Sequence, residues 1–196
     1  MSSVGRPETR IQILEAARAI FEEVGYYDAA LGAVAKKAGV SRQAIYLHFP
    51  SKAELLTALH LHIFATNVVP AMERHPATDA SALDALDAMI AADADILSKV
   101  WRVHEALQMA RRQHPEVEET LRPREEARYL EVLTLGRRLK REGVLPRGMP
   151  AGKFADLFWG LMNVGTYRSL VLERGWSLDQ YRDWVRTTIR LQIGVD

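Results

Sequence analysis

Apolar residues recur at helical spacing along most of this 196-residue chain, and no segment alternates apolar and polar residues as a half-buried strand does. A first helix is predicted to begin near Pro7 and to end at Gly25, with one apolar face made of Ile11, Leu14, Ala17, Ile20 and Phe21. A second, shorter apolar face follows at Leu31, Val34 and Ala35. The pattern predicts an all-α fold of about nine helices.

Proline, glycine and capping residues divide the rest of the chain. We expect further helices at roughly 51–70, 81–98, 99–113, 124–142, 151–174 and 178–193. The residues expected to mark the gaps are Pro70, Pro115, Pro123, Gly143 and Gly175. Ser177 and Gln180 form a capping-box pattern before the last helix.

Residues 38–52 hold a turn, a short helix and the start of another helix. Gly39 permits a sharp turn, Ser41 is placed to cap a helix at 42–48, and Pro50 ends that helix. Ser51 and Glu54 then form a second capping-box pattern. A short helix after so tight a turn is typical of a helix-turn-helix that reads DNA. We therefore predict a DNA-binding domain at residues 1–50 and a second domain at 51–196.

Residues 6–56 resemble the N-terminal signature of the TetR/AcrR family of bacterial transcriptional repressors. The matching positions are Val34-Ala35, Ala38 to Ser41, Ile45-Tyr46, His48-Phe49, Ser51-Lys52 and Leu55. The resemblance implies a three-helix head, followed by a larger helical domain that binds an effector and dimerises. Ala29 and Ala30 stand where the family usually has threonines that cap the second helix and touch a phosphate, so Asp28 is expected to cap instead.

The short helix supplies the candidate DNA contacts, with Ser41 at its cap. Arg42, Gln43, Ala44 and Leu47 are expected on its solvent side, where a helix in the major groove presents side chains to base edges. The residues expected to reach phosphates, as the resemblance also implies, are Tyr46, His48 and Lys52. The alternative is an ordinary exposed helix face with a half-buried Tyr46.

Charge and composition narrow the function only slightly. Residues 1–55 contain seven Lys and Arg and six Asp and Glu. Most of the acidic residues lie in the first predicted helix, whereas three of the basic residues surround the short helix. The chain has no cysteine and no long apolar run, so we expect a cytoplasmic protein without a membrane span. No catalytic motif or cofactor is indicated, and His60 and His62 point to different faces of one helix, which disfavours a metal site.

The second domain carries candidates for two further surfaces. The resemblance, and polar residues among aromatic ones, favour an effector cavity held by some of Trp101, His104, Gln108, Trp159 and Asn163. The last two helices are predicted to form a dimer surface through Leu157, Leu161, Val164, Arg168, Tyr181, Val185 and Ile189. The alternatives are that the aromatic stripe is plain core and that the dimer faces pack within one subunit.

These expectations combine into a homodimeric transcriptional repressor that binds double-stranded operator DNA and is released by a hydrophobic or amphipathic small molecule. Two rival hypotheses remain at this stage. One is a helical enzyme with an aromatic substrate site, and the other is a DNA-binding protein that responds to no ligand.

Overall fold

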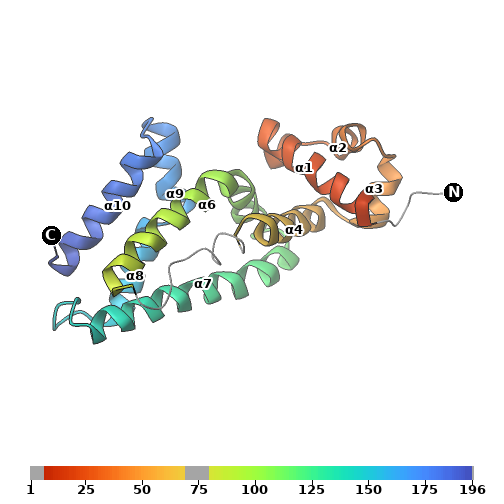
Figure 1. The fold of residues 1–196 in the computed structure, drawn as a ribbon. Helices are drawn as coiled ribbons and strands as arrows, with labels where there is room; N and C mark the ends of the chain where they lie inside the picture. The colour runs from red at the N-terminus through yellow and green to blue at the C-terminus, as the bar shows by residue number, and fades with distance from the viewer. Residues whose placement is uncertain (1–6, 69–79, 196) are drawn as a thin grey trace. The chain divides into compact units, whose positions relative to one another are not determined.

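The computed structural model describes residues 7–68 and 80–195, and these are helical with no strand, as the sequence predicted. The α-helices, labelled in Figure 1, are α1 (Pro7–Asp28), α2 (Leu31–Ala38), α3 (Arg42–His48), α4 (Lys52–Ile63), α6 (Ala82–Ala110), α7 (Pro115–Arg141), α8 (Ala151–Leu161), α9 (Val164–Tyr167) and α10 (Leu178–Ile193). Two π-helices, η1 (Phe64–Val68) and η2 (Arg168–Glu173), follow α4 and α9. The break expected at Pro70 lies outside the described residues.

The chain forms two compact units, each discontinuous in sequence. The first unit comprises Met1–Asn67 and Val100–Arg122, and the second comprises Val68–Lys99 and Pro123–Asp196. Of the three boundaries between them, one falls in η1, one within α6 and one within α7. The domain division predicted at residue 50 stays a prediction.

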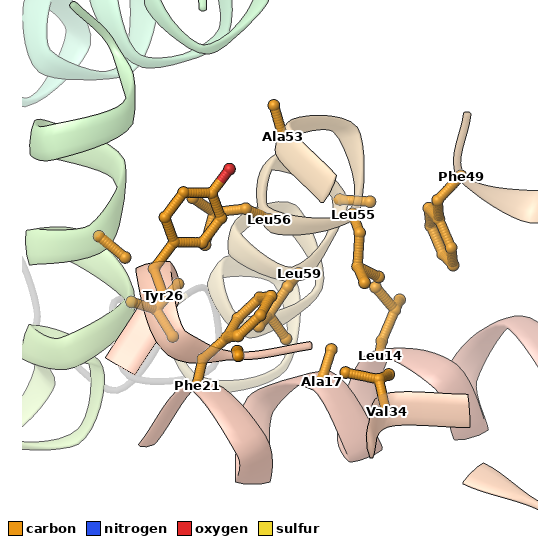
Figure 2. Packing of buried hydrophobic residues seen from close by; sticks show 14 of the residues in the cluster. Leu14, Ala17, Phe21, Tyr26, Val34, Phe49, Ala53, Leu55, Leu56 and Leu59 are labelled. Atoms are coloured by element: carbon orange, nitrogen blue, oxygen red, sulfur yellow. The ribbon is translucent and has the colours of Figure 1, made fainter. Parts of the chain in front are cut away.

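The first unit has one hydrophobic core to which α1, α2, α3 and α4 all contribute. Figure 2 shows part of it, including Leu14, Phe21, Val34, Phe49 and Leu59. The same cluster continues into the ends of α6 and α7 through Val103, Leu107, Val117 and Leu121. The small core of the head is therefore completed by side chains that come from much later in the chain.

One residue of the apolar face predicted for α1 is not buried. Ile11 is 48% exposed, whereas Ile13 is fully buried beside Leu14 and Ala17. The predicted end at Gly25 marks a real interruption, since this glycine has φ 78° and ψ 165° within the helical run. The chain turns there, and Tyr26 enters the core.

Three predicted helix limits in the later part of the chain are wrong. Helix α6 continues through the break expected at residue 98, because no glycine or proline stands between Ala82 and Ala110 to stop it. Helix α7 begins at Pro115 and runs through Pro123. A proline removes only one hydrogen-bond donor, and because Pro123 is exposed, water can satisfy the carbonyl left without a partner. The single helix expected at 151–174 is instead divided after Leu161.

The second unit buries one face of α10. Tyr181, Val185 and Ile189 are fully buried, and arginines on the same helix pair with aspartates of α6. Arg190 lies 2.8 Å from Asp87, and Arg182 pairs with Asp95. An apolar stripe flanked by ion pairs thus fixes α10 within the second unit of the chain.

Candidate nucleic-acid interface

The turn between α2 and α3 is built from backbone hydrogen bonds around Gly39. This residue has φ 67° and ψ 27°, a left-handed conformation that glycine adopts without steric cost. Its N–H donates to the Lys36 carbonyl over 3.3 Å, and the Val40 N–H donates to the Ala35 carbonyl over 3.1 Å. The Ser41 hydroxyl then accepts from the Ala44 N–H over 3.1 Å, so the predicted cap of α3 is confirmed.

Helix α3 presents one polar face and buries the other. Arg42 and Gln43 are exposed, and Leu47 is 65% exposed. Ala44 is buried next to Ile45, so the expectation that it faces solvent is wrong. A seven-residue helix is stable only if it packs, and positions 44 and 45 provide that packing.

Tyr46 pairs with Arg42 one turn earlier on the exposed face. The Arg42 guanidinium donates to the Tyr46 hydroxyl over 3.4 Å, and its Cζ lies 5.8 Å from the ring centroid. These contacts restrain the arginine along the helix surface. Tyr46 itself is 43% exposed, so both side chains are open to a partner.

The start of α4 adds a second group of polar atoms. The Ser51 hydroxyl accepts from the Glu54 N–H over 3.0 Å, which confirms the cap. The Lys52 ammonium donates to the Tyr27 carbonyl over 3.2 Å. Burial lowers the pKa of Lys52, and the nearby Asp28 carboxylate partly opposes this shift. His48 is half-buried, and within the described chain its Nε2 is buried without a hydrogen-bond partner.

The start of α2 differs from the prediction. Its N-cap is Ala30, which makes no side-chain capping hydrogen bond. Asp28 therefore does not cap this helix, because the cap position falls two residues later, where an alanine has no acceptor. The residue at the cap thus supplies no side-chain acceptor for the first N–H groups of α2, and Lys36 and Lys37 add positive charge in its last turn.

The predicted effector residues fall in different units. Trp101, His104 and Gln108 lie in the first, where the His104 Nε2 and the Gln108 Nε2 are 3.2 Å apart. Trp159 and Asn163 lie in the second. A hollow of about 230 Å³ has Trp101 in its wall, and a separate groove of about 470 Å³ has Trp159 in its wall. Neither contains all five residues, so the effector site stays a prediction.

Asn163 has a structural role that the sequence analysis missed. Its side-chain oxygen accepts from the Thr166 N–H over 3.0 Å and caps α9, while its Nδ2 donates to the Gly160 carbonyl over 2.8 Å. The Tyr181 hydroxyl donates to the Leu161 carbonyl over 2.8 Å. Side chains thus satisfy the backbone where α8 and α9 separate.

The predicted dimer residues divide by exposure. Tyr181, Val185 and Ile189 pack within the subunit, as the alternative hypothesis expected, and are not available to a partner. Arg168 is exposed, and those that are half-buried are Leu157, Leu161 and Val164. On the outer side of these helices, Trp159 is 37% exposed and Leu191 is 71% exposed.

The two histidines of α4 do not act together. The His62 Nε2 lies 2.8 Å from a carboxylate oxygen of Glu15, whereas His60 faces the ring of His104 at 6.3 Å. No cluster of three or more metal-ligating side chains occurs in residues 7–68 and 80–195.

Comparison with known proteins matches the head to a family. The model of the bacterial regulatory proteins of the tetR family matches residues 13–59, which run from α1 into α4. Residues 13–59 therefore carry the N-terminal domain of the TetR/AcrR family. The transcriptional regulator TtgR of Pseudomonas putida is 52% identical over 52 residues, which are 26% of this chain and 25% of TtgR. The match thus spans about a quarter of that relative's length.

Solved structures resemble this chain over nearly its whole length. A regulator from Saccharomonospora viridis, in complex with choline, has a TM-score of 0.80 and 24% identity, covering 94% of this chain and 97% of that one. FadR from Bacillus subtilis, in complex with stearoyl-CoA, has a TM-score of 0.75 and 19% identity, covering 93% and 98%. At these identities the likeness establishes the fold. None of the helices described here is long and apolar enough to cross a membrane.

Proposed function

We propose that this TetR-family transcriptional regulator binds operator DNA through α3 as a homodimer, represses transcription, and is released by a hydrophobic or amphipathic small molecule. The observation that carries the proposal is the exposed face of α3, which a tight turn and a serine cap hold beside the start of α4. That arrangement presents polar side chains from a rigid element, as major-groove recognition requires.

Base recognition is assigned to Arg42 and Gln43. A guanidinium can donate two hydrogen bonds to guanine, and a carboxamide can pair in the same way with adenine. Leu47, which is largely exposed, is suited to contact a thymine methyl group. Ala44 is left out of this set because it is buried.

Phosphate contacts are assigned to Tyr46 and Lys52, with the N-terminus of α4 nearby. Tyr46 lies in α3 and Lys52 is the first residue of α4, so the two residues come before and after the segment that joins these helices. Such contacts fix the register of a protein on DNA and carry no base preference of their own. They account for the salt dependence of binding.

Dimerisation is assigned to the outer sides of α8 and α10. Two heads fit successive major grooves when their recognition helices are about 34 to 36 Å apart, so a two-fold dimer sets the spacing. Exposed apolar side chains, among them Trp159 and Leu191, give these helices a surface for a second copy.

The effector is assigned to the amphipathic class. Two proteins of the same fold were solved with choline and with stearoyl-CoA, both of which join a charged group to apolar carbon. A ligand of this kind releases the regulator only if it binds the free protein more tightly than the DNA-bound protein.

The direct test is footprinting of the DNA upstream of the gene, followed by titration of operator variants. Arg42→Ala should cost roughly 1 to 3 kcal/mol at one base position and relax preference there. Lys52→Ala should weaken binding to all variants alike. Arg112→Ala, which removes another exposed arginine of the same unit, is the control and should change neither. An unchanged preference profile for Arg42→Ala would contradict the assignment of α3.

A further inference from the structure

Lys52 is held by the last residues of α1, beyond the interruption at Gly25. Its ammonium nitrogen lies 3.2 Å from the Tyr27 carbonyl oxygen and 4.6 Å from the centroid of the Tyr26 ring. The Tyr26 ring is itself fixed, because the residue is 8% exposed and packs edge-on against Phe21 at 5.6 Å. Tyr26 and Leu56 of α4 belong to the same cluster of buried side chains, part of which is drawn in Figure 2.

Gly25 creates this arrangement. Its φ of 78° with ψ of 165° lies in a region of backbone conformation that is essentially restricted to glycine. The conformation interrupts α1, and in the residues after it Tyr26 is buried and the Tyr27 carbonyl accepts from Lys52. Gly25, Tyr26 and Tyr27 thus form a binding site for the Lys52 side chain, which belongs to α4.

This binding site uses only part of the hydrogen-bonding capacity of Lys52. An ammonium group has three donors, and one of them is occupied by the Tyr27 carbonyl. The ring face attracts the positive charge without consuming a donor. No second hydrogen bond of this ammonium is found among residues 7–68 and 80–195, which leaves two donors for a phosphate. A side chain that is already held loses less rotamer freedom when it binds.

We propose that Tyr26 is a positioning residue for operator binding, which holds the Lys52 ammonium over its ring so that the lysine meets a DNA phosphate in a preformed geometry. The inference rests on the proposed function in that it takes Lys52 as a phosphate contact. It adds a buried aromatic residue that touches no DNA.

The experiment compares Tyr26→Leu, Tyr26→Phe and Lys52→Ala in the full-length protein. The slope of log affinity against log salt concentration should become shallower by about 0.9 per head in Lys52→Ala, because one phosphate contact is lost. Tyr26→Leu should change the slope in the same direction and lower the affinity roughly two- to fivefold per head. Tyr26→Phe keeps the ring and should restore both quantities.

Two controls separate positioning from loss of stability. Leu107→Ala removes a buried side chain from the same core and should lower stability without changing the salt slope. Tyr26→Leu combined with Lys52→Ala should bind no more weakly than Lys52→Ala alone, because the tyrosine acts only through the lysine.

A measurement without DNA keeps the inference testable if Tyr26→Leu fails to fold. In the wild-type protein the ε-methylene protons of Lys52 should resonate upfield of ordinary lysines, because they lie over an aromatic ring. Absence of that shift, or a folded Tyr26→Leu variant with the wild-type salt slope, would overturn the proposal. If the upfield shift is present and the protein binds no DNA, the proposed function is wrong, whereas the contact between Lys52 and the Tyr26 ring is confirmed.

Discussion

Gly39 shows how much of the head depends on single residues. Its left-handed conformation joins α2 to α3, and two backbone hydrogen bonds close around it. Empty space surrounds the position where a Cβ atom would stand, so the constraint is the backbone angle and not crowding. Any change here acts through conformational strain.

Gly39→Ala should therefore lower the free energy of unfolding by about 1 kcal/mol. The control is Gly32→Ala in α2, where a Cβ atom also meets nothing within 4 Å and no positive φ is required. That variant should be at least as stable as the wild type. Urea denaturation of both proteins measures the difference, and equal stabilities would contradict the strain argument.

Caps and turns were predictable from the sequence because they are local. Ser41, Ser51 and Ser177 each accept from the N–H group three residues later, as their patterns indicate. Burial was less predictable. Ala44 and Ile11 were assigned to the wrong faces, because the face that packs depends on partners that are distant in sequence.

At the scale of elements, the division between α8 and α9 was not visible in the sequence. Asn163 resembled a polar residue in an apolar helix, whereas it is the N-cap of a new one. A close approach of α7 and α8 was equally hidden. A Cβ atom on Gly136 would lie 2.9 Å from the Ala151 carbonyl oxygen, a constraint that only the packed helices reveal.

Tyr181 supports the division of α8 from α9, and it should make stability depend on alkaline pH. Burial raises the pKa of its hydroxyl far above the usual value, with a smaller contribution from Tyr167. Because the folded-state pKa is raised, the stabilisation is complete below about pH 10, the usual tyrosine pKa, and is lost as the pH rises further.

Tyr181→Phe should be less stable than the wild type by about 1 kcal/mol at pH 8, because the hydrogen bond to the Leu161 carbonyl is removed. The difference between the two proteins should shrink above pH 10. Denaturation curves at pH 8 and pH 11 measure it, and a difference that is constant or grows with pH would be inconsistent with the buried hydroxyl.

At the scale of the whole molecule, the assembly prediction distinguishes two faces of α10. Leu191→Glu places a charge on the exposed face and should yield folded monomers with reduced operator affinity. Val185→Glu buries a charge within the subunit and should lower stability instead.

Light scattering and thermal denaturation of the two variants report both properties. Leu61→Glu, an exposed leucine of α4, is the control and should remain dimeric. If Leu191→Glu and Trp159→Glu are both intact dimers, the interface lies elsewhere.

Effector release should obey reciprocal linkage between the two ligands. A small molecule that lowers operator affinity by some factor must bind the DNA-bound protein more weakly by the same factor. Tryptophan fluorescence quenching, with and without operator, measures the affinity of the effector for the DNA-bound and for the free protein. An effector that binds equally well in the two cases would refute release by this route.

The discontinuous core of the first unit limits how its N-terminal helices can be combined with the later helices of another regulator. The segment that matches the family model ends at residue 59, yet Val103, Leu107, Val117 and Leu121 belong to the same cluster as the head. A hybrid that joins α1 to α4 of this chain to the later helices of another protein would place side chains of a different size and shape in this core. To exchange DNA specificity between relatives, these four residues should therefore be transferred together with α3.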